Sequence, residues 1–173
     1  MSTTVGSGKY TYEVNDDWAK LPDGWQMPAA AVTVDSRDRV YCFNRTPDHP
    51  IVVFDRDGNY LSSWGAGPFK FPHTIRADAD DNLWIVDRDH AQMLLYTNTG
   101  TLLRTIGTRG YRSDTGVGPT DFSSTAYRNV THAGGPFNLP TDIALTPSGE
   151  MFMTDGYGNA RVHKFAADGT YRF

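Results

Sequence analysis

The chain contains a single cysteine, Cys42, among its 173 residues, and no apolar run as long as a membrane-spanning helix. One cysteine excludes a disulfide within the chain. Without an apolar run of about 18 residues, we expect no membrane partner. The first residues lack a basic stretch followed by an apolar one, so we expect no secretory signal and predict a cytoplasmic location.

An excess of basic charge is also missing, because the net charge is −4 and the 16 Lys and Arg residues are scattered along the chain. Proteins that bind nucleic acids usually concentrate basic residues on one face, so we expect no nucleic-acid partner. Long segments with helical periodicity are absent as well. The chain has instead 17 Gly and 10 Pro residues, which favour short strands joined by turns.

Three segments repeat one pattern: residues 30–65, 73–107 and 141–173. Each begins with two alternating strands joined by a polar turn and continues with a third strand and a glycine turn. The anchor pairs of the first two strands are equally spaced in the three segments, as Val32/Val40, Ile75/Leu83 and Ile143/Met151. Four short strands in a repeat of about forty residues are typical of a β-propeller blade.

The repeats predict an all-β chain that contains about three blades, at residues 24–65, 66–107 and 137–173. Residues 108–136 form an insertion between the second and third blades. Residues 1–23 are an N-terminal arm or an outer strand that closes the ring. Because open sheet edges are avoided by closure, we expect the remaining blades to come from a longer chain or from a second copy, and favour the longer chain.

Three stretches carry a family resemblance. They read VTVDSRDRVYCFNR from Val32, FPHTIRADADDNLWIVD from Phe71, and FNLPTDIALTPSGEMFMTDGYGNARVHKF from Phe137. They resemble NHL-repeat propellers and, more narrowly, peptidyl-α-hydroxyglycine α-amidating lyase, which is a six-bladed member. The resemblance implies that the chain is the N-terminal part of an NHL-type six-bladed β-propeller. Gly158 stands where secreted animal members have a disulfide cysteine, so the chain resembles disulfide-free bacterial relatives.

The resemblance also implies site residues. Arg45 and Tyr157 match catalytic positions, and His73 matches a zinc ligand. Val32 and Ile75 match positions whose main-chain carbonyls hold a structural calcium, a hard cation that accepts such oxygens readily. The other zinc histidines and a calcium-binding aspartate of the family belong to later blades.

Each site residue also has a purely structural interpretation. His73 follows Pro72 and opens an inner strand, where a histidine can be hydrogen-bonded without metal. Ala30 and Thr141 stand at its repeat position, so this position contributes one histidine, whereas a catalytic zinc site needs about three protein ligands. Arg45 can pair with a surface carboxylate, and Tyr157 can serve packing alone. The remaining histidines are interpreted as surface or turn residues: His49, His90, His132 and His163.

Two functions remain open. The resemblance implies a zinc-dependent lyase that cleaves a peptide or small acyl substrate ending in α-hydroxyglycine to an amide and glyoxylate. Arg45 would bind the carboxylate, for which a guanidinium is well suited, and Tyr157 would act as base. The alternative is a non-catalytic NHL propeller that binds a protein or peptide partner across one face.

Overall fold

The computed structural model describes residues 3–173, and the all-β prediction is confirmed, with 5% helix. The first sheet contains β3 (Ala29–Val34), β4 (Val40–Asn44), β5 (Ile51–Phe54) and β6 (Tyr60–Trp64). The second contains β7 (Pro72–Ala77), β8 (Leu83–Asp87), β9 (Gln92–Tyr96) and β10 (Leu102–Ile106). The third contains β11 (Asp142–Leu145), β12 (Met151–Asp155) and β13 (Arg161–Phe165). Each sheet is antiparallel, with its strands paired in chain order.

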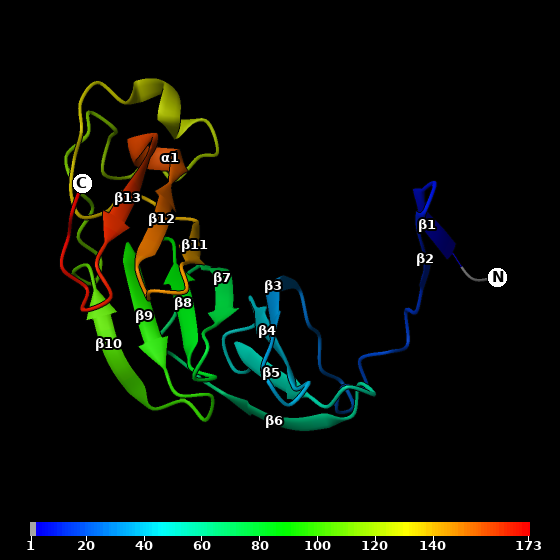
Figure 1. The fold of residues 1–173 in the computed structure, drawn as a ribbon. Helices are drawn as coiled ribbons and strands as arrows, with labels where there is room; N and C mark the ends of the chain where they lie inside the picture. Colours follow the sequence, from blue (N-terminus) through cyan, green and yellow to red (C-terminus); the bar gives the residue numbers. More distant parts are fainter. Residues whose placement is uncertain (1–2) are drawn as a thin grey trace.

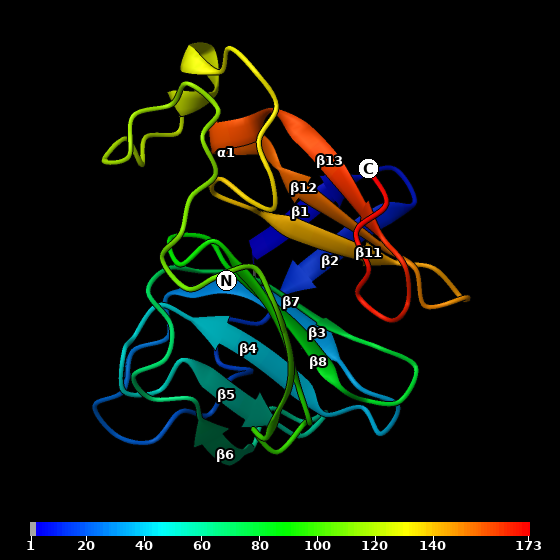
Figure 2. The same ribbon diagram turned by 90° about the vertical axis from the view of Figure 1, so that its left-hand side faces the viewer.

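The three sheets follow one another around a curve, with β3, β7 and β11 on its inner side (Figures 1 and 2). The Thr33 hydroxyl accepts a hydrogen bond of 3.0 Å from the Ala77 backbone N–H, which ties β3 to β7. An ion pair of 3.1 Å between Arg76 and Asp142 ties β7 to β11. Neighbouring sheets are therefore linked along their inner strands.

The repeat seen in the sequence reappears as a repeated register. Val34 faces Val40 in the first sheet, Ala77 faces Leu83 in the second, and Leu145 faces Met151 in the third. The turn between these strands is closed by a polar side chain at its first position. In the second sheet, Asp78 Oδ1 accepts hydrogen bonds of 2.9 Å from the backbone N–H groups of Asp80 and Asn82. Such local acceptors favour turns, since they satisfy backbone donors that no strand reaches.

The core lies between the sheets. One apolar cluster joins the first and second sheets, and includes Phe43, Ile85 and Leu94. Another joins the second and third, and includes Trp84, Phe137 and Met153. A third covers the far face of the first sheet with residues that precede it: Trp18, Leu21, Trp25 and Met27 pack there against Cys42, Val52 and Phe54. Sheets that are apolar on both faces bury their side chains against each neighbour in turn.

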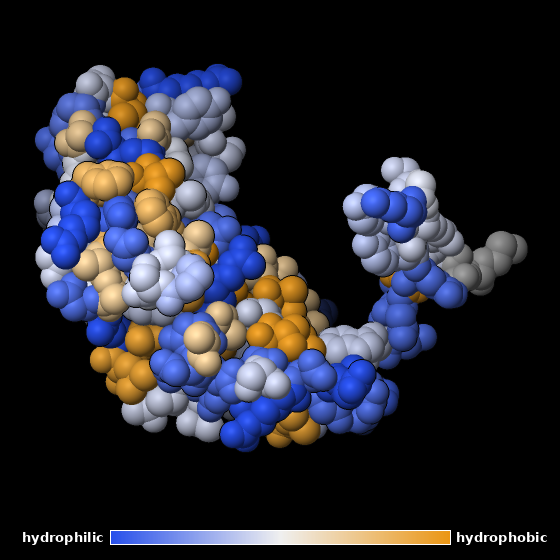
Figure 3. Space-filling model, in the orientation of Figure 1, coloured by the Kyte–Doolittle hydropathy of each residue, from blue (hydrophilic) through white to orange (hydrophobic). Residues whose placement is uncertain are grey.

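The N-terminal hairpin of β1 (Thr3–Ser7) and β2 (Tyr10–Val14) stands apart from the curved body (Figures 1 and 3). The chain first joins the body at Trp18, whose ring packs on Phe54 at 5.5 Å between centroids. Hydrophobic residues on the body surface form separate patches among hydrophilic ones (Figure 3). Neither helix among residues 3–173 has the length and apolarity needed to cross a membrane.

The predicted insertion lies against the short helix α1 (Gly156–Asn159), as Thr115 bonds to Gly158 and Gly134 bonds to Asn159. It contains the 3-10 helix η1 (Ala126–Asn129), whereas α1 follows β12. The backbone of Tyr171–Phe173 pairs with Lys164 and Phe165 of β13. The third sheet thus begins a further strand at its outer edge. The six-bladed NHL type, the blade count and the domain boundaries stay predictions.

Candidate functional site

His73 is the second residue of the inner strand β7. The register of β7 against β8 shifts between Pro72 and Thr74, so His73 has no direct partner in the ladder. Irregularities of this kind turn a side chain away from the regular alternation of a strand. The imidazole is half-buried, and its Nδ1 is buried without a hydrogen-bond partner among the described residues.

The surroundings of His73 favour a neutral imidazole. Burial is the largest cause that lowers its pKa below the usual value, and the positive charges of Arg88 and Arg45 lower it further. A backbone hydrogen bond with Thr141 and the carboxylate of Asp142 act in the opposite direction and do not outweigh them. A neutral imidazole is the form that binds metal.

Arg45 follows β4 directly and lies beside the start of β7. Its Nε donates a long hydrogen bond of 3.5 Å to the Pro72 carbonyl, and its guanidinium carbon lies 4.3 Å from the centroid of the Phe71 ring. Among the described residues, no carboxylate lies within ion-pair distance of Arg45. The sequence had left open a surface pair with an aspartate, which the described residues do not provide.

Tyr157 comes from the third sheet and meets His73. Their ring centroids lie 5.9 Å apart with an interplanar angle of 68°, an edge-to-face arrangement. β12 ends at Asp155, and Tyr157 lies in α1, two residues further on. The structure therefore brings together Arg45, His73 and Tyr157, one residue from each repeat. Their catalytic and metal-binding roles stay predictions.

Arg88 is a member of this group that sequence reasoning missed. Its guanidinium carbon lies 3.9 Å from the centroid of Phe71 and 5.3 Å from that of Tyr157. Only 8% of the residue is exposed. Its Nε donates a hydrogen bond of 2.7 Å to Asp89. Arg88 follows β8 as Arg45 follows β4, which is a signal that the repeat alignment contained.

The buried carboxylate of Asp87 fixes the end of β8, which Arg88 follows. Asp87 ends β8, is fully buried and accepts the backbone N–H groups of Lys70 and Phe71 at 2.8 and 2.9 Å. Its Oδ2 also lies 2.7 Å from Nδ1 of His90. These contacts hold the chain before β7 against the end of β8, and so position Phe71 between the strands that carry Arg45 and Arg88.

The described residues do not complete a metal centre. Among residues 3–173, no group of three or more His, Cys, Asp or Glu side chains is placed to hold a metal ion. His73, with its unpartnered Nδ1, fits one zinc ligand, and a single donor falls short of a catalytic site. The Val32 side chain is exposed and that of Ile75 is fully buried, on neighbouring inner strands. Their carbonyls as calcium ligands stay a prediction.

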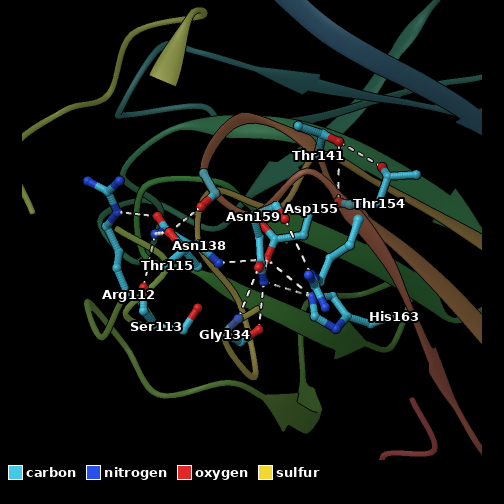
Figure 4. Close-up of polar contacts among 12 residues, drawn as sticks. Arg112, Ser113, Thr115, Gly134, Asn138, Thr141, Thr154, Asp155, Asn159 and His163 are labelled. Carbon is cyan, nitrogen blue, oxygen red and sulfur yellow. Dashed lines mark hydrogen bonds and ion pairs between the residues drawn. The ribbon is translucent and has the colours of Figure 1, made fainter. Parts of the chain in front are cut away.

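A buried polar cluster lies behind α1, formed by Asp155, Asn138, Asn159 and His163 (Figure 4). Asp155 Oδ2 accepts hydrogen bonds from the Asn138 backbone N–H at 2.7 Å and from Asn159 Nδ2 at 2.9 Å, and lies 3.2 Å from His163 Nε2. The interpretation of His163 as a surface or turn residue is wrong. It is fully buried, because it lies on the same face of β13 as Phe165.

The insertion fastens this cluster and α1 from outside. The Thr115 hydroxyl donates a hydrogen bond of 2.6 Å to the Gly158 carbonyl, and Asn138 Nδ2 donates one of 2.9 Å to Thr115 Oγ1. Arg112 Nε donates to Asn138 Oδ1 at 2.7 Å (Figure 4). Residues 108–136 therefore help to set the position of the helix that carries Tyr157.

The other three histidines lie outside the site. His49 stacks on Trp25 with ring centroids 3.3 Å apart. His90 pairs with Asp87, as described above. The His132 side chain is half exposed and lies 3.4 Å from Asp114. None of these three contacts involves Arg45, His73, Arg88 or Tyr157.

Comparison with curated proteins finds amidating lyases. The chain is 32% identical over 124 residues to peptidyl-alpha-hydroxyglycine alpha-amidating lyase 2 of Drosophila melanogaster, covering 70% of this chain and 26% of that protein. It is 26% identical over 120 residues to a probable lyase of the same name from Caenorhabditis elegans, covering 69% of this chain and 29% of that protein. The chain thus spans less than a third of these relatives. No protein-family model matches it.

Comparison with solved structures supports a propeller-like fold. A streptogramin B lyase superposes with a TM-score of 0.57 at 14% identity, over 86% of this chain and 41% of that one. A virginiamycin B lyase from Staphylococcus aureus gives a TM-score of 0.57 at 14% identity, over 87% of this chain and 42% of that one. At this identity the likeness concerns the fold alone.

Proposed function

The curated homologues of this chain are peptidyl-α-hydroxyglycine α-amidating lyases, and we propose that it contributes to the same kind of reaction, the cleavage of a carbinolamide. The observation that carries the proposal is the meeting of Arg45, His73 and Tyr157, which come from three different repeats. A cation, a neutral imidazole and a phenol at one place suit a substrate with a carboxylate and an ionisable hydroxyl.

The reaction removes one proton and breaks one bond. In an acyl-α-hydroxyglycine, the hydroxyl oxygen loses its proton and forms the carbonyl of glyoxylate. The bond between that carbon and the amide nitrogen breaks, and the nitrogen takes a proton to give the amide. No oxidant is needed, because the electron pair of the broken bond stays on nitrogen.

Each of the three residues has a role in this scheme. Arg45 binds the substrate carboxylate, for which its unpaired guanidinium is available. Tyr157 acts as the base that takes the hydroxyl proton and returns it to the leaving nitrogen. Its place against the His73 ring supports this assignment.

The metals are part of the proposal. We propose that His73 is one ligand of a zinc ion whose other ligands lie outside residues 3–173, and that the carbonyls of Val32 and Ile75 contribute to a calcium site. The described residues supply one zinc donor. The substrate would be a peptide or a small acyl compound.

The experiment uses the complete polypeptide in which this chain occurs. After dialysis, its zinc content is measured, and it is incubated with an N-acyl-α-hydroxyglycine while glyoxylate and amide are quantified. We expect one zinc per chain and equal amounts of both products. His73→Ala should lose the zinc, and the isolated 173 residues should retain less than one zinc per chain.

Two outcomes would contradict the proposal. A complete polypeptide that binds zinc but releases no glyoxylate would favour a non-catalytic propeller. Full zinc content in the isolated 173 residues would show that further ligands lie within them, and His132 in the insertion would be the first to test.

A further inference from the structure

Arg45 and Arg88 occupy the same position in consecutive repeats. Arg45 follows β4, which pairs with β3, and Arg88 follows β8, which pairs with β7 in the same register. Both guanidinium groups contact the ring of Phe71, at 4.3 and 3.9 Å from its centroid. The repeat therefore delivers two permanent positive charges to one aromatic ring, next to His73 and Tyr157.

Only one of these charges is compensated. Arg88 Nε pairs with Asp89 at 2.7 Å, whereas Arg45 meets no carboxylate within ion-pair distance among residues 3–173. The other nearby carboxylate, Asp87, is fully buried and already accepts two backbone N–H groups. The described residues therefore leave the Arg45 guanidinium without a paired carboxylate.

The two arginines also have N–H donors that make no hydrogen bond within the described residues. Within the described part of the chain, the terminal Nη atoms of Arg45 and of Arg88 make no hydrogen bond. Arg88 keeps Nη1 and Nη2 free because Asp89 takes its Nε, and its guanidinium lies over Tyr157 at 5.3 Å from the ring centroid. A nearly buried guanidinium with free N–H groups beside a phenol is placed to meet a polar ligand.

We propose that Arg88 is a substrate-binding residue, which together with Arg45 binds the single carboxylate of a monoanionic substrate. The inference rests on the proposed function and adds a second residue to its carboxylate site. Two planar guanidinium groups with free N–H donors suit the two oxygens of a carboxylate. A neutral hydroxy-amide would leave the N–H groups of Arg88 without the charged acceptor they suit best.

A structural role for Arg88 predicts something different. If Arg88 only supports Phe71 and Asp89, its replacement should lower the affinity for every ligand to a similar degree, because the position of Phe71 becomes less fixed. If it binds the carboxylate, its replacement should weaken anions and spare neutral analogues of the same shape. The contrast between a charged and a neutral probe therefore separates the two roles.

The test measures binding directly, in the complete polypeptide, with two probes of nearly equal shape. Oxamate is a monoanion and oxamide is its neutral amide, and their affinities are measured by NMR titration. Arg88→Met should lower the affinity for oxamate by about 10- to 100-fold and leave the affinity for oxamide unchanged. Arg88→Lys should fall between, since lysine keeps the charge and loses the planar pair of donors. Arg56→Met is the control, because Arg56 is exposed and pairs at 3.8 Å with Asp38.

A second variant guards against a misfolded Arg88→Met protein. Among residues 3–173, Asp89 is the one carboxylate paired with Arg88. Asp89→Asn removes its negative charge, so oxamate should bind several-fold more tightly. Thermal unfolding checks that each variant is folded. Equal loss of oxamate and oxamide binding in Arg88→Met, or unchanged oxamate binding in both Arg88→Lys and Asp89→Asn, would overturn the proposal.

The binding test is separate from the proposed reaction. If oxamate binding depends on Arg88 but no variant or wild-type protein releases glyoxylate, the carboxylate subsite stands and the lyase proposal fails. If glyoxylate is released but oxamate binding ignores Arg88, the lyase proposal stands and the assignment of Arg88 fails.

Discussion

The helix α1 takes part in two regions with different surroundings. Tyr157 lies in the region of Arg45, Arg88 and His73, where N–H groups and an imidazole nitrogen have no partner among the described residues. Asn159 lies in the buried polar cluster, where Asp155 Oδ2 accepts hydrogen bonds from the Asn138 N–H and from Asn159 Nδ2 and lies 3.2 Å from His163 Nε2. Asp155 Oδ1 and His163 Nδ1 have no partner within the described part of the chain, so the contacts that hold α1 are those of Oδ2. The free N–H groups of the two arginines, by contrast, are available to a ligand. The comparison suggests that the buried polar cluster positions α1, and that the region around His73 is where Tyr157 of α1 meets a ligand.

The largest expected effect comes from removing the Tyr157 hydroxyl. In the complete polypeptide, Tyr157→Phe should lower carbinolamide cleavage by roughly 10²- to 10⁴-fold, the usual contribution of a general base. The melting temperature should hardly change, because this hydroxyl makes no hydrogen bond within the described residues. Tyr127→Phe, at an exposed position on η1, is the control. Full activity in Tyr157→Phe would remove Tyr157 from the mechanism.

The polar cluster should respond in stability. Asp155→Ala removes the acceptor of the Asn138 N–H and a neighbour of His163 Nε2, while Asn159 Nδ2 keeps the Gly134 carbonyl as acceptor. At about 1–3 kcal/mol for a buried unsatisfied group, the free energy of unfolding should fall by about 2 kcal/mol or more, as measured by urea denaturation. Asp114→Ala, whose side chain is 87% exposed, should change it by less than about 0.5 kcal/mol. Similar values for both variants would contradict a positioning role.

Two glycines of α1 offer a closer comparison. A Cβ at Gly158 would lie 2.4 Å from both the carbonyl oxygen and Oδ1 of Asn138, whereas a Cβ at Gly156 would meet nothing within 4 Å. Gly158→Ala should therefore destabilise the fold by about 1–3 kcal/mol. Gly156→Ala should be neutral or stabilise it by up to about 1 kcal/mol, since alanine favours helices. Thermal unfolding of both variants under one condition decides the matter.

The smallest effect concerns Cys42, which is buried on β4 in the first sheet. Burial raises the pKa of its thiol to about 11. At pH 8, roughly one thiol in a thousand would then be ionised, and only the thiolate reacts with disulfide reagents. Native protein should therefore react very slowly with a thiol-specific reagent, and urea should make the reaction fast. Rapid reaction in the native state would show that the first sheet opens readily.

Much of the sheet architecture could be predicted, because period-two alternation and equally spaced turns are local signals. Residues such as Val40, Leu83 and Met151 take equivalent places in the sheets, as the repeat predicted. The helix α1 could not be predicted in this way. A four-residue helix with two glycines has no periodicity, and its position depends on hydrogen bonds from Thr115 and Gly134 in the insertion.

Two site-related residues show what sequence reasoning overlooked. His163 and Phe165 are two residues apart in β13 and therefore share one face of the strand, while Val162 and Lys164 lie on the other. The alternation of the strand thus predicted that His163 is buried. Arg88 matches Arg45 in the repeat, but nothing next to it in the sequence distinguishes it from a surface arginine. Its contacts with Phe71 and Tyr157 depend on how neighbouring sheets pack, which is tertiary information.

The pairing of strands only with their neighbours in the chain also affects how the molecule opens. Each sheet is a meander in which strands pair only with their neighbours in the chain, so its hydrogen bonds close short loops. The loop-closure entropy lost when one sheet forms is therefore small and does not depend on the other sheets. Proteins built this way open in cooperative units that hydrogen exchange detects separately. An opening of the third sheet alone would carry Tyr157 away from His73 while the first two sheets kept their protection. Access to the region around His73 would then follow the equilibrium of one sheet, well below the free energy of global unfolding.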